Sequence, residues 1–336
     1  MATVDLVSRL DCTGCHACGI VCPVAAIRFV KDGEGFFVPK IETSVCIGCG
    51  RCVKACPVNN DFTKDVASEA YLVRLKDRKV LKRSASGGAF VGLARFLLKN
   101  PSSAVVGASL CDDLVVRHIM VGCEKELHRL QNSKYVQSDV GNIYNEVRER
   151  LNAGSTVLFS GTPCQVAGLI GTLAETETRN LFTVDVVCHG VPSPAFLERQ
   201  LKEESSSNHG GVKSYRFRFK NPLFESTSSY IMIMEMERGL PVVRRVAQDP
   251  YFNLFVVGLS LRESCYRCRF SGLRRVGDFS IGDCDSHHHY PGFFPNESNS
   301  ILLVNSEKAR KLWDSGLSSV FHFTRLDLEL EAVYNR

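Results

Sequence analysis

From about residue 65 onward the chain alternates short apolar runs with longer amphipathic stretches. Runs rich in Val, Leu and Phe predict strands, and apolar residues at helical spacing predict the helices between them. The predicted strands cover residues 69–77, 103–110, 114–122, 155–160 and 180–188. The predicted helices lie within residues 84–100, 137–154, 165–174 and 194–204. This alternation favours an α/β layer structure.

Capping residues sharpen these helix boundaries. Ser86 is a candidate cap for the first helix, and Ser138-Asp139 for the second, which Gly154 should end. Ser193 is the expected cap of the fourth helix, with Pro194 at its first position.

Later segments predict further strands of a different kind. Residues 212–220 and 228–237 alternate apolar and polar side chains and should pair antiparallel, as an inserted sheet. Residues 277–283 and 300–306 should add strands to the main sheet. The fold class predicted for this part is therefore an α/β domain with a mixed sheet.

Composition and charge narrow the class of protein. The 336 residues are 44% hydrophobic and 23% charged, as in ordinary globular proteins. No apolar run approaches the ~18 residues of a membrane span, and the first ten residues lack signal-peptide features. The net charge of +5 is scattered rather than gathered in a stripe. We therefore expect a cytoplasmic protein with no membrane span and no nucleic-acid partner.

The cysteines change this picture, because eight of the 15 precede residue 57. They form two copies of the pattern C-x2-C-x2-C-x3-C-P, which is the spacing of bacterial two-cluster ferredoxins. In such runs three closely spaced thiolates reach one [4Fe–4S] cube and the fourth reaches the other cube. The predicted ligands are Cys12, Cys15, Cys18 and Cys56 for one cluster, and Cys46, Cys49, Cys52 and Cys22 for the second.

Zinc and disulfides are the alternatives for these runs. Zinc sites usually pair C-x2-C with a distant second pair, and disulfides do not suit a reducing compartment. The repeat, with a short hairpin expected at residues 33–42, predicts a ferredoxin-like α+β domain over residues 1–62 and a second domain over residues 63–336.

A third group of cysteines follows in the second domain. Cys164 and Cys188 stand at the ends of two predicted strands, and Cys265 and Cys268 form a C-x2-C pair. Four thiolates could hold one more cluster. The alternatives are a zinc site or cysteines that are simply small buried apolar residues.

Three glycine-bearing turns lie where the strands of an open α/β sheet end, which is where ligands bind. They are residues 84–88, 160–165 and 188–193. Glycine lets backbone N–H groups close around an anion, so these turns could form an anion site. Ordinary turns are the alternative, since none of the three matches G-x-G-x-x-G or a Walker A loop.

Taken together, SASGGAF, SKYVQSD, LFSGTPCQVAGL, VDVVCHGVPSP and CYRCRF followed by GDFSIGD resemble the coenzyme F(420) hydrogenase/dehydrogenase beta-subunit family. The family also includes the plant reductase that acts on hydroxymethyl chlorophyll. The resemblance extends from the first cysteine to about residue 305, with the motifs in the family's order.

This resemblance implies an FAD-binding α/β domain beside a [4Fe–4S] cluster held by Cys164, Cys188, Cys265 and Cys268. Members pass electrons between iron–sulfur clusters and a substrate through the flavin. The residues that the resemblance places around FAD are Ser86, Gly87, Gly88, Ser133, Lys134, Tyr135, Gln137, Ser138, Gly161, Thr162, Pro163 and Gln165. Residues 282–292 should shape the substrate mouth.

The function expected from sequence is an iron–sulfur flavoprotein oxidoreductase that exchanges electrons with a deazaflavin or an unidentified metabolite. The alternative is an electron-transfer subunit that serves a separate catalytic partner. A ferredoxin-like or other redox partner protein is expected in either case. By motif position alone, His189, Lys134 and Tyr135 are the candidates for acid–base chemistry, and a packed structural role is the alternative for His189. Relatives often extend beyond Arg336, so we expect a chain shortened at its C-terminus.

Overall fold

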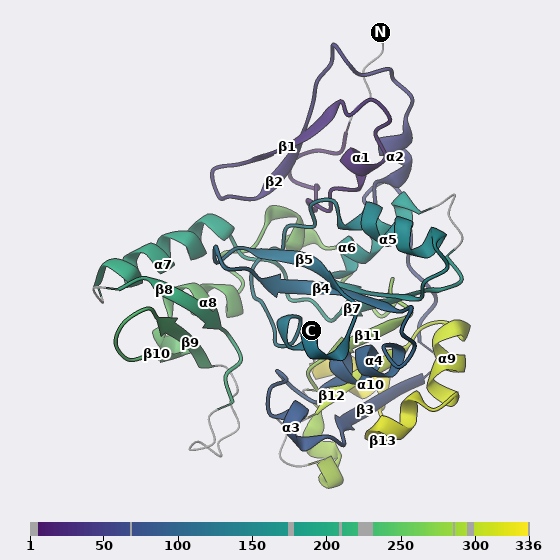
Figure 1. Ribbon diagram of the computed structural model, residues 1–336, viewed down its shortest axis with the longest axis vertical. Coiled ribbons are helices and arrows are strands. Elements are labelled where there is room, and N and C mark those ends of the chain that lie inside the picture. Colours follow the sequence, from purple (N-terminus) through teal and green to yellow (C-terminus); the bar gives the residue numbers. More distant parts are fainter. Residues whose placement is uncertain are drawn as a thin grey trace.

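The computed structural model of the chain describes residues 6–67, 69–173, 178–207, 210–220, 231–284, 286–293 and 299–334. A small N-terminal domain lies against one side of a larger α/β domain, and a three-stranded unit projects from another side (Figure 1).

The N-terminal domain keeps the symmetry of its repeated sequence. Helices α1 (Ala17–Ile20) and α2 (Arg51–Ala55) each follow a residue in the left-handed region, His16 with φ 65° and Gly50 with φ 74°. The predicted hairpin is present as an antiparallel pair of β1 (Ile27–Lys31) and β2 (Phe37–Ile41), and it begins earlier than expected.

A mixed sheet forms the centre of the larger domain, as the sequence predicts, and the described residues give it eight strands, of which the strand at residues 321–325 was not predicted. Its order is β13-β3-β12-β11-β7-β6-β4-β5. Four inner strands, β4, β6, β7 and β11, run parallel, and antiparallel strands flank them on both sides. The bounds are β3 Glu69–Leu75, β4 Ala104–Leu110, β5 Val116–Val121, β6 Val157–Gly161, β7 Leu181–Val186, β11 Phe279–Gly282, β12 Ser300–Val304 and β13 Phe321–Arg325.

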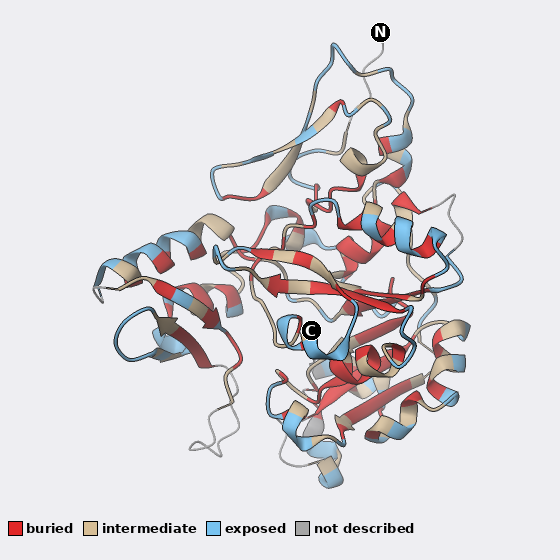
Figure 2. Ribbon diagram, viewed as in Figure 1, coloured by how far each residue is buried: buried red, intermediate tan, exposed pale blue. Residues whose placement is uncertain are grey.

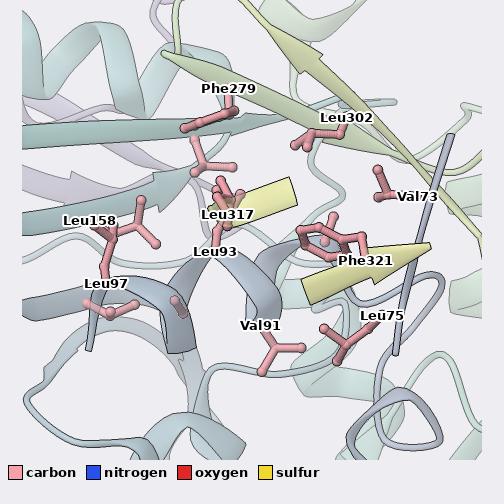
Figure 3. Close-up of a cluster of buried hydrophobic side chains, with 14 of the residues drawn as sticks. Val73, Leu75, Val91, Leu93, Leu97, Leu158, Phe279, Leu302, Leu317 and Phe321 are labelled. Carbon is pink, nitrogen blue, oxygen red and sulfur yellow. The ribbon is translucent and has the colours of Figure 1, made fainter. Parts of the chain in front are cut away.

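Helices cover both faces of this sheet, because successive side chains of a strand point to opposite faces. On β6, Leu158 joins the core under α4 and α9, whereas Val157 and Phe159 join the core under α5 and α6. Figure 3 shows the first core, with Leu93 and Leu97 of α4 close to Leu158. The remaining helices of this domain are α3 Arg78–Leu81, α4 Ala89–Leu97, η1 Glu124–Arg129, α5 Ile143–Asn152, α6 Pro163–Thr172, η4 His287–His289, η5 Pro291–Phe293, α9 Glu307–Asp314, η7 Leu317–Val320 and α10 Leu328–Tyr334.

The segment between β7 and β11 carries the projecting unit. Its three strands are antiparallel, in the order β10-β9-β8, and pack on α7 and α8, which agrees with the predicted inserted sheet. Part of the second predicted strand, residues 228–230, lies outside the described residues. The bounds are α7 Pro194–Ser207, β8 Val212–Arg216, β9 Ile231–Met236, β10 Val242–Arg245, η2 Val246–Gln248, α8 Pro250–Val256 and η3 Glu263–Arg267.

Two of the three predicted helix starts are wrong. Gly88, with φ 77°, precedes α4, and the hydroxyl of Ser86 bonds Ser300 instead of capping the helix. Helix α5 starts at Ile143, because Ser138 turns inward to His118. The Ser193 cap is confirmed, since its hydroxyl accepts the N–H of Phe196 at 3.1 Å.

Burial follows the layers. The strands of the large sheet are mostly buried, whereas the N-terminal hairpin is mostly exposed or half-buried (Figure 2). Among the described residues, no helix has the length and apolar character needed to cross a membrane.

Two phenylalanines of β13 test how far stability depends on the core under α4. Phe321 is 2% exposed and packs beside Gly92, whereas Phe323 is 46% exposed. We expect Phe321→Ala to lower the free energy of unfolding by about 3–5 kcal/mol. The matched change Phe323→Ala should cost about 1 kcal/mol, from its two aromatic edge contacts. Urea titration of both variants measures the difference, and equal losses would contradict this assignment.

Candidate functional site

The second cysteine set surrounds a small cavity in the N-terminal domain. Cys22, Cys46, Cys49 and Cys52 all line it, so the structure brings Cys22 of the first run to three cysteines of the second run. The left-handed backbone at Gly48, with φ 68°, and at Gly50 shapes this loop. The backbone N–H of Ala26 donates to Cys22 Sγ at 3.2 Å, a contact of the kind that tunes a cluster's reduction potential.

The first cysteine set lies deeper, on the side of the larger domain. Burial, together with the neighbouring thiols of Cys164, Cys12 and Cys56, raises the pKa of Cys15 to about 12. The pKa of Cys18 is also raised, mainly by burial and in addition by its charge interactions with Cys15, Cys12 and Cys56. The four predicted ligands are thus close enough for their charges to interact. Such thiols ionise when a metal centre binds them.

The third set gathers at the carboxyl edge of the sheet. Cys164 is in the first turn of α6, Cys188 follows β7, Cys265 lies in η3 and Cys268 follows η3. Burial raises the pKa of Cys164 to about 12, and charge interactions with Cys265 and Cys268 are among the other causes. Burial likewise raises the pKa of Cys188, next to Cys164, Cys265 and Cys268. Within the described residues, no three His, Cys, Asp or Glu side chains converge tightly enough to hold a single metal ion.

Helix α6 separates the first and third sets by little more than its own backbone. A Cβ atom at Gly168 would lie 3.0 Å from Cys15 Cβ and 3.1 Å from Cys15 Sγ. A Cβ atom at Gly171 would overlap the carbonyl oxygen of Ala55, the residue before Cys56. The two glycines therefore let the N-terminal domain sit directly on the helix that carries Cys164.

A cavity of about 650 Å³ lies at the carboxyl ends of the parallel strands. The three glycine-bearing turns meet there, with contributions from β4, β6, β7 and β11. Of the predicted cofactor-binding residues, those that line the cavity are Ser86, Gly88, Ser133, Lys134, Tyr135, Ser138, Gly161, Thr162 and Gln165. Cys188 and His189 line it as well, so the third cysteine set reaches the cavity wall.

Three predicted cofactor-binding residues do not line this cavity. Pro163 is buried at the first position of α6. Gly87 packs against the main chain of β3 and β12, where a Cβ atom would overlap Val73 O and Ser300 N. Gln137 points instead to the N-terminal domain, where its Nε2 donates to Thr13 O at 2.9 Å.

Lys134 brings a basic side chain to the cavity. Its Nζ donates to the backbone oxygens of Gln131 at 2.7 Å and Arg129 at 3.4 Å, and no carboxylate of the described residues forms an ion pair with it. Burial lowers the pKa of Lys134 to about 7. An anionic group in the cavity would favour the charged form of this amine.

A buried polar network supports the same wall. Gln165 holds the N-terminus of α6, because its Oε1 accepts from Thr162 N at 3.1 Å, and its Nε2 donates to Ser138 Oγ at 3.0 Å. Ser138 Oγ lies 2.9 Å from His118 Nδ1, and His118 Nε2 lies 3.0 Å from Ser160 O. Burial lowers the pKa of His118 to about 4, so this histidine is neutral.

The acid–base candidates differ in their surroundings. The hydroxyl of Tyr135 accepts from Arg218 at 3.0 Å, and Arg218 also pairs with Asp283 at 2.6 Å. Burial raises the pKa of Tyr135. His189 is exposed, and its Nε2 lies 3.1 Å from Phe255 O.

Four charged or polar residues at this site were not predicted from the sequence: His118, Arg275, Asp185 and Arg262. Arg275 donates to Asp185 at 2.9 Å and to Val186 O at 2.9 Å, which fixes the segment after Cys268 to the end of β7. Of these residues, only His118 could have been predicted from the sequence, because it is a polar residue at an inward position of an apolar strand.

Family models match both the N-terminal cysteine-rich domain and the larger domain. Residues 154–327, more than half of the chain, match the family model for the C-terminal region of the beta subunit of coenzyme F420 hydrogenase/dehydrogenase. The chain belongs to this family. Two further models, each described as a 4Fe-4S dicluster domain, match residues 11–60 and 38–86. The N-terminal region is therefore a ferredoxin-type 4Fe–4S domain, and the family predicted from sequence is confirmed.

Similar proteins match parts of the chain. One subunit of an F(420)H(2) dehydrogenase from Methanosarcina mazei is 24% identical over 169 residues, which are 48% of each chain. One subunit of a Na(+)-translocating ferredoxin:NAD(+) oxidoreductase complex from Acetobacterium woodii is 43% identical over 49 residues, 15% of this chain and 14% of that protein. The match thus spans about half of the first relative and a smaller part of the second.

A solved structure shares the fold. It is the xenon-derivatised F420-reducing [NiFe] hydrogenase complex from Methanosarcina barkeri, in which one chain superposes with a TM-score of 0.53. Sequence identity is 16%, and the superposition covers 80% of this chain and 85% of that chain.

Gly171 tests the contact between the N-terminal domain and α6. We expect Gly171→Ala to push Ala55 away and to destabilise the packed state by about 1–3 kcal/mol. Hydrogen exchange of residues 46–60 should accelerate. Gly272→Ala is the matched control, because a Cβ atom there meets nothing within 4 Å. Equal exchange in both variants would show that α6 does not hold this domain.

Lys134 is expected to react as an amine near neutral pH. Because its pKa is about 7, acylation of Lys134 should reach half its maximal rate near pH 7, whereas ordinary lysines need pH above about 10. Labelling of cofactor-free protein between pH 6 and 10, followed by peptide mass spectrometry, measures this. Inorganic pyrophosphate should protect Lys134 but not exposed Lys54. A pH profile like that of other lysines would contradict the effect of burial.

Proposed function

We propose that this chain is an iron–sulfur flavoprotein module that passes electrons between ferredoxin-type clusters and a small substrate through FAD. The observation that carries the proposal is Cys188, which belongs to the third cysteine set and also lines the 650 Å³ cavity. An iron–sulfur cluster held by this set would therefore lie at the wall of the cavity in which a substrate would react.

The spatial order of the cysteine sets supports the proposal. Cys52 of the second set lies close enough to Cys18 of the first set for its charge to raise the pKa of Cys18. In the same way, the charge of Cys164 in the third set raises the pKa of Cys15 in the first set. The order is therefore second set, first set, third set and cavity. Iron–sulfur clusters exchange single electrons, so three clusters in this order would connect the protein surface to the cavity.

The cavity fits a flavin nucleotide in size and chemistry. Its volume is within the range of small-molecule sites. Lys134 and the backbone of the glycine-bearing turns suit a pyrophosphate, and Phe90, Val187 and Ile281 offer apolar walls for a ring. A flavin, when bound, exchanges single electrons with clusters and an electron pair with organic molecules.

This chain's own residues would prepare the site. Neutral His118 and Ser138 hold Gln165 and the start of α6 in place without adding charge. The Arg218–Asp283 pair fixes the hydroxyl of Tyr135 at the cavity wall. We propose Lys134 as the anion-binding residue, and Tyr135 and His189 as the groups that face a proton-accepting or proton-donating substrate.

Coenzyme F420 is the first substrate to test, because both family relatives are named for it. An unidentified metabolite with a reducible ring is the second. Val187 and Val256, which are 38% and 40% exposed, line the cavity and offer an apolar surface to such a ring.

The second candidate function is an electron-transfer subunit that works with a separate catalytic protein. The loop of the second cysteine set favours a partner, because Cys49, Ile47 and Val45 are exposed around it. Turnover of coenzyme F420 by the purified chain with reduced ferredoxin would exclude this alternative as the sole role. Turnover only after a partner is added would favour it.

Iron and flavin analysis of protein purified without oxygen tests the proposed function. Three cubes of four irons give about 12 irons per chain, with about one FAD. We expect Cys188→Ala to lose about four irons, since three thiolates remain for the third cluster. The control Cys123→Ala removes an exposed thiol outside the three sets and should keep all the iron. About eight irons and no flavin in the unaltered protein would reject the proposal.

A further inference from the structure

Arg262 stands between the two cysteine sets that flank α6, and its role is distinct from that of the other buried arginines. Three arginines of the described residues are buried: Arg218, Arg262 and Arg275. Arg218 pairs with Asp283 and Arg275 pairs with Asp185. Arg262 is 3% exposed, and no carboxylate of the described residues lies within ion-pair distance of it.

Neutral acceptors take all of its hydrogen bonds. Nε donates to Cys12 O at 2.7 Å, Nη2 to Phe37 O at 3.0 Å and Nη1 to Gln137 Oε1 at 3.0 Å. The guanidinium also lies over the Phe36 ring, 5.2 Å from its centroid. A buried cation without a counter-charge is costly, so this position calls for an anion nearby.

The side chain and the main chain of Arg262 reach different cysteine sets. Cys12, whose carbonyl it binds, belongs to the first set. Its own carbonyl accepts the N–H of Cys265, which belongs to the third set, at 2.8 Å. A cube bound by four thiolates is an anion that gains one negative charge on reduction, so a fixed cation between two cubes favours the reduced state of each.

We propose that Arg262 is the positioning residue that couples the ferredoxin domain to the third cluster, by holding the Cys12 and Cys265 loops together and by raising the reduction potentials of the two clusters beside it. The proposal rests on the proposed function, because it requires those clusters.

The second cluster supplies an internal reference. The residues around its cavity include neither Arg262 nor any of the residues that Arg262 contacts, namely Cys12, Phe36, Phe37 and Gln137. Its potential should therefore stay the same when Arg262 changes.

Two substitutions of Arg262 separate the effect of its charge from the effect of its hydrogen bonds. Arg262→Gln removes the charge, and Arg262→Lys keeps the charge but loses the three-way donor arrangement. Arg267→Gln is the matched control, because Arg267 ends η3, which Arg262 directly precedes, and 59% of its side chain is exposed, so solvent screens its charge. All proteins are purified without oxygen, their iron is counted, and their clusters are titrated with a reductant under electron paramagnetic resonance.

We expect Arg262→Gln to keep its iron and to shift the potentials of two clusters to more negative values, with the reference cluster unchanged. Arg262→Lys should keep the potentials near those of the unaltered protein, and Arg267→Gln should shift none. If Arg262→Gln loses iron, retention of iron and potential in Arg262→Lys still supports the role of charge.

The proposal would be overturned if Arg262→Gln kept all its iron and all its cluster potentials. It would also be overturned if the Gln and Lys variants lost equal amounts of iron, because Arg262 would then have a purely structural role. Failure of the proposed function is distinguishable, because the unaltered protein would then contain fewer than about 12 irons before any substitution is made.

Discussion

The close contact between the ferredoxin domain and α6 sets how the first cysteine set lies relative to the third set and the cavity. Gly168 and Gly171 leave no side chain between α6 and two residues of the ferredoxin domain, Cys15 and Ala55. The same helix carries Cys164 in its first turn, and its start is held by Gln165. Since electron transfer weakens with separation, the absence of two side chains on α6 determines how near the first and third cysteine sets can lie.

Charge is distributed according to what each part of the site must hold. Two buried arginines with carboxylate partners, Arg218 and Arg275, fix loops around the cavity. Two basic side chains of the site, Arg262 and Lys134, form no ion pair with a carboxylate of the described residues: Lys134 lines the cavity, and Arg262 contacts the main chain of Cys12 in the first set. Burial raises the pKa of cysteine thiols in all three sets. The polypeptide therefore disfavours free thiolates at these positions, and it suits thiolates that a metal centre stabilises.

The sheet explains where the cavity forms. Four parallel strands end at the same edge, and their following turns carry Thr162, Cys188 and Asp283 to one place. The buried Arg275–Asp185 pair then returns the segment after Cys268 to the end of β7. The inserted three-stranded unit contributes Phe255 and Val256, which close another side of the cavity. Residues far apart in the chain meet because parallel topology aligns strand ends.

Features that depend on local spacing could be predicted before any fold was known. The repeated cysteine runs indicated the ferredoxin domain, the strand–helix rhythm indicated the mixed sheet, and Ser193 marked a true helix start. Packing, in contrast, makes Ser86 bond β12 rather than cap α4, and it makes Gln137 and Arg262 join the two domains. Gln137 and Arg262 are 125 positions apart and lie in no shared periodic pattern. Local spacing constrains only neighbours in the chain, whereas such contacts arise when packed elements bring distant side chains together.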